Sequence, residues 1–238
     1  MSAYAIGSLA HGGFSPAVSD VDLALLTDDA AGAVALDVAA EVRASGLALA
    51  DRLSIFHAPW AAFSDPPPDA RFPPIDRYDL VHFGILVHGT DHRATYGAAP
   101  TGEQIREHAV ASALQRVTPA RLAADLRELE AGGVTVHDAT KIVLWPVRLQ
   151  HVCDTAQATG NAAAVDHYVE LPDARHRSLV RDALGWRSLS AMEDPRGSLR
   201  RIADEIHDLH AEVFGRLADR PDLPRRDELA RRGQELRA

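Results

Sequence analysis

The chain has 238 residues, of which 46% are hydrophobic and 25% charged, so it can form one large domain or two small ones around a sizeable core. Its formal net charge of −9 disfavours a nonspecific nucleic-acid binder, which needs a basic surface to neutralise phosphates. The only cysteine, Cys153, excludes an intrachain disulfide framework, and because neither a membrane-spanning apolar run nor a signal peptide is recognisable, we expect a cytoplasmic protein without membrane contact.

The first hundred residues alternate short strands with helices. Residues 3–6 predict a strand that runs directly into Gly7-Ser8, and the glycines and proline that follow predict a loop. A second strand is expected over 21–26 and a third over 53–58. Between them, the Ala-rich segment 30–50 predicts a helix, because alanine has the highest helix propensity. Its apolar positions are dense, so we expect this helix to pack against a sheet.

The proline-rich segment 59–77 interrupts this alternation. Its six prolines predict a long irregular loop, because proline lacks a backbone donor and restricts the residue before it. A short helix over 78–83 and a strand over 85–87 are expected next. Residues 97–102, with Pro100 inside, are typical of a domain junction. Arg77, Tyr78 and Asp79 follow the proline-rich segment and could line a cleft.

The remainder of the chain predicts helices. We expect them over 103–116, 119–131, 138–159, 162–168, 174–186 and 198–217. Thr118 followed by Pro119 is typical of an N-cap with proline at the first helical position, and Gly160 is a plausible helix stop. His207 and His210 lie three residues apart, which favours a solvated helix face over a zinc site. After Pro221 the chain is dense in Arg and Glu, which predicts a partly disordered tail or a solvated helix.

The most informative stretch is residues 7–26, where a strand ends in Gly7-Ser8 and two aspartates follow on the next strand. The period of two in a strand places Asp20 and Asp22 on the same face. Two adjacent carboxylates repel each other, and a divalent cation removes that repulsion. Mg²⁺ favours carboxylate oxygens together with substrate phosphates. A Gly-Ser bend offers amide donors and a hydroxyl to a triphosphate.

Each part of this pattern also has an ordinary structural interpretation. Gly-Ser alone is usually a turn, and Asp-x-Asp alone is usually a solvated strand edge or loop. The combination, with both parts next to apolar strands, favours a site for a metal-bound nucleoside triphosphate.

The stretch resembles the signature of the polymerase-beta-like nucleotidyltransferase superfamily, which consists of Gly-Ser, a Gly-rich spacer and Ser-Asp-x-Asp before an apolar run. It is most similar to bacterial aminoglycoside adenylyltransferases of the streptomycin/spectinomycin type. Residues 141–160 and 171–184 also resemble the C-terminal helical domain of that family. The resemblance implies an α+β fold. Residues 1–100 would form a nucleotidyltransferase domain, a small mixed sheet with flanking helices, and residues 101–238 an all-α helical-bundle domain.

The same resemblance implies an activity and a set of site residues. It implies in-line transfer of a nucleoside monophosphate, AMP if the triphosphate is ATP, to a hydroxyl of a small acceptor such as an aminoglycoside, with release of pyrophosphate. Asp20 and Asp22 would hold Mg²⁺. Gly7 and Ser8 would contact the β- and γ-phosphates, and Ser19 of the Ser-Asp-x-Asp motif completes the nucleotide-binding residues.

Two features depart from the family. Its third acidic residue, a metal ligand or general base, aligns with Ser54, and a serine is not a base at neutral pH. Asp51 is the first candidate to replace it; His57 should point to the other face, and a base from the helical domain is a further option. The family also has a helix before the first strand, so we expect either a start further upstream or a dispensable helix. These departures leave two alternatives open: a catalytically degenerate nucleotide- or partner-binding protein, and an antitoxin-like protein-modifying nucleotidyltransferase.

Overall fold

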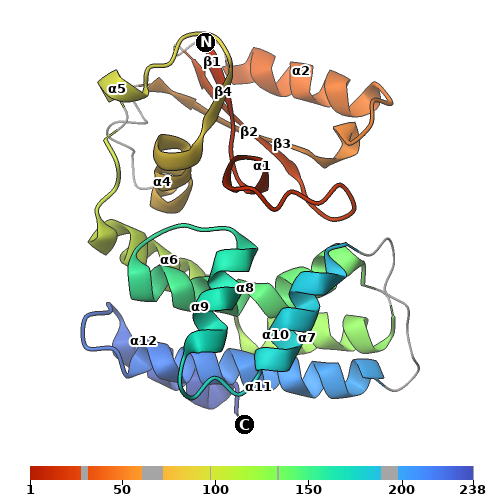
Figure 1. Cartoon of the computed structure of the whole chain (residues 1–238), viewed down its shortest axis with the longest axis vertical. Coiled ribbons are helices and arrows are strands. Elements are labelled where there is room, and N and C mark those ends of the chain that lie inside the picture. The colour runs from red at the N-terminus through yellow and green to blue at the C-terminus, as the bar shows by residue number, and fades with distance from the viewer. Residues whose placement is uncertain (28–31, 61–71, 97, 133, 189–197, 238) are drawn as a thin grey trace. The chain divides into compact units, whose positions relative to one another are not determined.

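The computed structural model describes residues 1–27, 32–60, 72–96, 98–132, 134–188 and 198–237. In these residues the strands lie in the N-terminal part and the C-terminal part is helical, so the expected α+β class is confirmed (Figure 1). The contacts within the chain group into two compact units, Met1–Thr101 and Gly102–Ala238. None of the described helices is both long and apolar enough to cross a membrane.

A four-stranded mixed sheet forms the centre of the first unit, with the strand order β3-β2-β1-β4 (Figure 1). The strands are β1 (Ser2–Ala5), β2 (Val21–Thr27), β3 (Leu53–Pro59) and β4 (Ile85–His88). β1 pairs antiparallel with both β2 and β4, whereas β2 and β3 run parallel. All four strands were expected from the sequence, because each is a short apolar run bounded by turn residues.

Short helices surround this sheet. They are α1 (Ser8–His11), α2 (Gly32–Ala44), the 3₁₀ helix η1 (Ala50–Arg52), α4 (Pro74–Phe83) and α5 (Arg93–Tyr96). One face of the sheet carries Tyr4 and Leu26 into the core, where they meet Leu80 of α4 together with Trp60 and Phe72. Because alternate residues of a strand share a face, Asp22 lies on the same face as Leu26, which is the face that α4 covers.

Two predicted boundaries in this unit are wrong. The helix expected over 30–50 ends at Ala44, and Gly46 has a positive φ of 73° that a right-handed helix does not allow. The irregular loop expected over 59–77 is already helical from Pro74, because proline is tolerated in the first turn of a helix. The middle of that loop, 61–71, lies outside the described residues.

The second unit is built around two long helices, α8 (Val136–Thr155) and α11 (Ser198–Ala218), which pack against each other. The other helices are α6 (Gly102–Arg116), α7 (Pro119–Glu130), α9 (Asn161–Glu170), α10 (Arg177–Trp186) and α12 (Arg226–Glu235). The predicted helices up to residue 217 are confirmed, with their ends shifted by a few residues. The Thr118 side chain accepts a hydrogen bond from the backbone N–H of Arg121, as expected of an N-cap.

The tail after Pro221 differs from its prediction. Residues 226–235 form α12, which packs along α11 and buries Leu229 and Leu236 completely. The helical alternative is therefore confirmed, but one side of this helix is buried in the core rather than solvated. The high density of Arg and Glu makes this burial hard to recognise in the sequence, because the buried stripe needs only a few apolar residues on one side of the helix.

Candidate functional site

The Gly7-Ser8 bend connects β1 to α1 and lies against Asp22. Gly7 has φ 64° and ψ −142°, a backbone conformation that is open almost only to glycine. A Cβ atom on Gly7 would lie 2.6 Å from Oδ2 of Asp22, so the backbone approaches this carboxylate more closely than any other residue type allows. The N–H of Ile6 also donates to the carbonyl of Asp22 over 3.0 Å. Two motifs that are separated in the sequence therefore meet at one end of the sheet.

The Ser-Asp-x-Asp segment leads from a turn into β2. Ser19 is buried, and its hydroxyl accepts a hydrogen bond from the N–H of Ser15 over 2.9 Å, which closes the turn. Asp20 precedes the first residue of β2, and Asp22 is the second residue of that strand. Both aspartates are partly exposed. Ser19 thus holds the turn that presents Asp20, and its assignment to nucleotide binding stays a prediction.

β3 brings Ser54 directly beside Asp22, because the parallel register pairs these two residues. Paired residues on neighbouring strands share a face, so Ser54 occupies the position at which the resemblance implied a third carboxylate. His57 lies on the other face, as expected, where its Nε2 is 2.8 Å from the hydroxyl of Thr27. The strand therefore offers a hydroxyl, and neither an acid nor an imidazole, next to Asp22.

Asp51 is exposed on η1, the 3₁₀ helix that leads directly into β3. Its neighbour Arg52 donates a hydrogen bond over 2.6 Å to the carbonyl of Pro16, in the loop that leads to Asp20. η1 is thus fastened to the same loop as the first aspartate. The role of Asp51 as a replacement for the third acidic residue stays a prediction.

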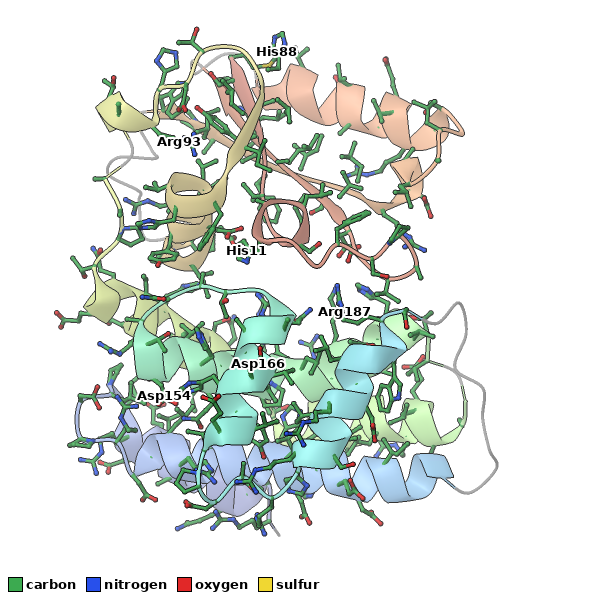
Figure 2. All side chains as sticks on the ribbon, in the orientation of Figure 1. His11, His88, Arg93, Asp154, Asp166 and Arg187 are labelled. Atoms are coloured by element: carbon green, nitrogen blue, oxygen red, sulfur yellow. The ribbon has the colours of Figure 1, made fainter. Side chains whose placement is uncertain are left out.

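A further carboxylate at the site comes from α4. Asp79 is 7% exposed, and its Oδ2 accepts the backbone N–H of Gly7 over 2.7 Å. Its Oδ1 contacts Nε2 of His11 in α1, which lies next to α4 (Figure 2). Sequence reasoning suggested only that Asp79 could line a cleft. The available signal for a buried Asp79 was its place directly before Leu80, a residue of the core. Buried carboxylates are rare unless they are paired, so such a residue calls for a partner.

The donor set around Gly7 suits a hard divalent cation. Asp22 supplies a carboxylate beside Gly7 and Ser54 a hydroxyl, and Asp20 lies two residues before Asp22 in the chain. Mg²⁺ is usually bound through one or two carboxylates together with phosphates and water. In the described part of the chain, no three His, Cys, Asp or Glu side chains are arranged to hold a metal by themselves. Among the described residues, none forms a hydrogen bond with the hydroxyl of Ser8.

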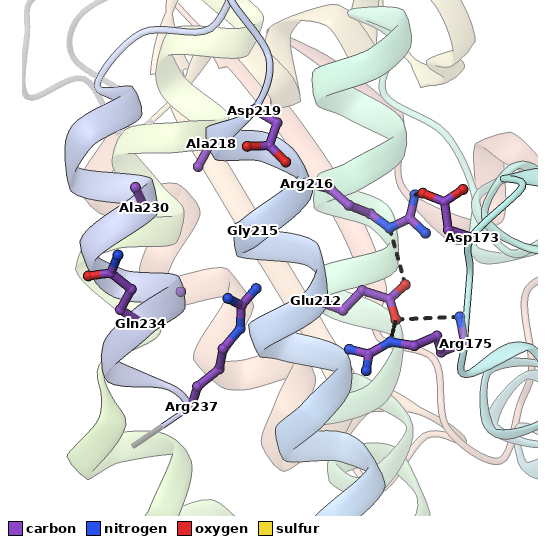
Figure 3. A pocket seen from close by; sticks show the side chains of 11 residues that line it. Asp173, Arg175, Glu212, Gly215, Arg216, Ala218, Asp219, Ala230, Gln234 and Arg237 are labelled. Carbon is purple, nitrogen blue, oxygen red and sulfur yellow. Dashed lines mark hydrogen bonds and ion pairs between the residues drawn. The ribbon is translucent and has the colours of Figure 1, made fainter.

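A cavity of about 410 Å³ in the second unit is a different kind of feature (Figure 3). It lies beside α11 and α12, and its central charge is the buried Glu212. This carboxylate accepts hydrogen bonds from Tyr168 over 2.9 Å, Arg175 over 2.9 Å and Arg216 over 3.2 Å. Burial, with Glu212 nearby, raises the pKa of the Tyr168 hydroxyl. These contacts neutralise Glu212, so the cluster is explained by packing without any ligand.

A second charged cluster in the same unit links three helical segments. Asp154 of α8 accepts hydrogen bonds from His167 of α9 over 2.7 Å and from Gln150 over 2.9 Å, and it pairs with Arg220 beyond α11 (Figure 2). His210 is buried rather than on a solvated face, with Nε2 3.0 Å from the carbonyl oxygen of Ile142. Both arrangements are contacts between helices, although the described residues leave Nδ1 of His210 and Oε1 of Gln150 buried without a hydrogen-bond partner. The Gly7 bend remains the candidate functional site.

Comparison with protein-family models gave no match, and comparison with curated proteins gave none either.

Proposed function

We propose that the chain is a Mg²⁺-dependent nucleotidyltransferase, which transfers AMP from ATP to a hydroxyl of a small acceptor such as an aminoglycoside. In this proposal residues 1–100 are the nucleotidyltransferase domain and residues 101–238 a helical-bundle domain. The observation that carries the proposal is the contact between the glycine-only bend at Gly7 and the carboxylate of Asp22. The close approach of the backbone to this carboxylate depends on glycine, because no other residue has both the conformation and the space.

Each proposed site residue has its own role in the reaction. Asp20 and Asp22 would hold Mg²⁺, which when bound neutralises charge on the triphosphate and polarises its α-phosphate. The Gly7 N–H is occupied by Asp79, so Gly7 acts through its backbone shape, and the Ser8 hydroxyl donates to a phosphate oxygen. The acceptor oxygen bonds to the α-phosphorus while the bond from that phosphorus to the bridging oxygen of pyrophosphate breaks. The hydroxyl proton passes to a base, for which Asp51 is our candidate.

One observation favours a second candidate function, a degenerate nucleotide-binding protein. Ser54 stands beside Asp22 where a third carboxylate would complete the catalytic set. A protein that lacks this group could still bind the metal–nucleotide complex. Pyrophosphate release in the presence of a panel of aminoglycosides separates the two functions, because only the enzyme releases it in step with modification of an acceptor.

We predict that the chain binds ATP in a Mg²⁺-dependent way. ATP with Mg²⁺ should raise the unfolding temperature of the chain, since a ligand at one hundred times its Kd stabilises by about 2.7 kcal/mol. ATP without Mg²⁺ should have a much smaller effect. Asp22→Asn should abolish the Mg²⁺-dependent part, because the amide cannot replace a carboxylate as a ligand for a hard cation.

The matched control is Asp37→Asn, which removes one exposed carboxylate from α2 in the same unit. This variant should respond to ATP and Mg²⁺ like the wild-type protein. Equal responses of Asp22→Asn and Asp37→Asn would show that the assigned site does not bind the metal–nucleotide complex, and the proposed function would be wrong.

A further inference from the structure

Asp79 is a nearly buried carboxylate to which the proposed reaction gives no chemical role. It lies on α4, far from the bend in the sequence, and is 7% exposed. One oxygen accepts the N–H of Gly7 over 2.7 Å, and the other contacts Nε2 of His11. A carboxylate is costly to bury unless such donors satisfy it, so these contacts account for its position in the fold.

The two contacts of Asp79 hold opposite ends of one short turn. Gly7 begins the turn and His11 ends it, and the N–H groups of Ala10 and His11 both donate to the Gly7 carbonyl over 3.0 Å. The same helix α4 also carries Phe83, whose ring centroid is 4.5 Å from that of His11. α4 therefore fastens the whole turn, and Asp79 supplies its polar contacts.

The turn needs such an anchor because of the backbone of Gly7. Glycine is conformationally permissive, so nothing in the residue itself selects this conformation and the surrounding contacts must hold it. The Gly7 N–H points at Asp79, while the position of a Cβ on Gly7 would lie against Oδ2 of Asp22. Loss of the hydrogen bond would free the bend to turn away from Asp22, and the Ser8 hydroxyl would move with it.

We propose that Asp79 is a positioning residue of the nucleotide site, which holds the Gly7-Ser8 bend in the shape that receives the β- and γ-phosphates. This inference rests on the proposed function. Asp79 acts through Gly7 and His11 and touches neither metal nor substrate. Its effect should therefore fall on nucleotide affinity, because the phosphates lose a preorganised partner in the ground state as well as in the transition state.

The test compares Asp79→Asn with Asp91→Asn. Asp91 is a structural carboxylate of the same unit. It accepts a hydrogen bond from the Tyr4 hydroxyl over 3.0 Å and forms an ion pair with Arg93 over 2.7 Å. Titration calorimetry with ATP and Mg²⁺ is carried out well below the unfolding temperature of each variant. We expect Asp79→Asn to raise the Kd about tenfold and the nucleotide KM in parallel with little change in kcat. Asp91→Asn should lower the unfolding temperature and leave the Kd unchanged.

The Kd values of the two variants decide between a role in the nucleotide site and a role in stability alone. A wild-type Kd for Asp79→Asn overturns the inference and leaves the proposed function standing. An equal rise in Kd for Asp79→Asn and Asp91→Asn also overturns it, since the effect would then be general destabilisation. Absence of Mg²⁺-dependent ATP binding by the wild-type protein overturns the proposed function and this inference together.

A milder variant keeps the inference falsifiable if Asp79→Asn does not fold. His11→Gln removes the imidazole contact of Asp79 but leaves the hydrogen bond from Gly7 in place. We expect about a threefold rise in the Kd for ATP with Mg²⁺. We also expect faster hydrogen exchange at residues 8–11 without nucleotide, which a role outside the bend would not produce. Unchanged affinity and unchanged exchange would contradict the role of Asp79.

Discussion

At the scale of single residues, the candidate site is distinguished by the pair of Asp22 and Ser54. The two residues are partners in the parallel ladder between β2 and β3, so their side chains leave the sheet on one face. A carboxylate at position 54 would stand beside Asp22 without any change in the backbone. The position thus allows a direct test of whether the missing acid limits the proposed reaction.

We predict that Ser54→Glu makes the protein more dependent on Mg²⁺. Without the cation, the variant should be less stable than the wild-type protein by about 0.5–1 kcal/mol, because like charges would face each other across the two strands. With Mg²⁺ the extra carboxylate should reverse this loss and raise the rate of pyrophosphate release in the presence of ATP and an acceptor. Thermal unfolding with and without Mg²⁺ and a pyrophosphate assay measure the two effects.

Ser54→Gln is the matched control for this prediction, since it has a similar length and no charge. It should lose little stability and should not respond more strongly to Mg²⁺ than the wild-type protein does. If Ser54→Glu and Ser54→Gln respond alike to the cation, position 54 does not face the metal site.

At the scale of elements, the crossing of α11 and α12 shows how the chain end enters the core. A Cβ on Gly233 of α12 would lie 3.3 Å from the backbone nitrogen of Gly215 in α11, so the two helices touch through their backbones. Leu229 and Leu236 are buried on either side of this point. A methyl group at position 233 would already make a tighter contact than most, and a larger side chain does not fit between the two backbones.

We predict that Gly233→Leu destabilises the protein by about 1–3 kcal/mol, because the added side chain must force two packed helices apart. Gly215→Ala is the control. The nearest atom to its added methyl group belongs to the guanidinium of Arg237, at the free end of a flexible side chain. The better helix propensity of alanine should keep this variant within about 1 kcal/mol of the wild-type protein. Urea unfolding of both variants measures the difference, and a Gly233→Leu variant as stable as Gly215→Ala would contradict the described crossing.

At the scale of the whole molecule, histidines of the helical unit contribute to the response of stability to acid. Burial lowers the pKa of His210 to about 4 from its usual value of 6.5, and the contact with the Ile142 carbonyl only partly opposes this shift. Burial also lowers the pKa values of His108, His151 and His176. His210 thus has a pKa of about 4 in the folded state and about 6.5 in the unfolded state. Between these two values the unfolded chain binds more protons than the folded one, so stability rises with pH in that window.

We predict that the free energy of unfolding falls as the pH is lowered from about 6.5 to about 4, with His210 contributing roughly 3 kcal/mol to the loss. His210→Gln keeps a donor for the Ile142 carbonyl but does not titrate. Its loss of stability over this range should be smaller by about that amount. Urea unfolding at a series of pH values measures both proteins, and parallel curves would mean that His210 is not buried in its neutral form.

The sequence by itself was sufficient for features that depend on neighbouring residues. The four strands, the Gly7-Ser8 bend and the alternation in β2 follow from apolar periodicity and from the turn chemistry of glycine, proline and serine. The helices of the second unit up to residue 217 follow in the same way from propensity and caps. These properties are local, so a short window of sequence contains most of the information that determines them.

Only the tertiary structure decided which distant groups meet. Asp79 accepts a hydrogen bond from the N–H of Gly7, which lies 72 residues earlier in the sequence, and nothing in either segment specifies this partner. The burial of the charged tail as α12 was likewise invisible, because it depends on the surface of α11 onto which Leu229 and Leu236 pack. The physical reason is the same in both cases. Long-range contacts result from the packing of complete elements, and a sequence pattern records the face that an element offers but not the element that covers it.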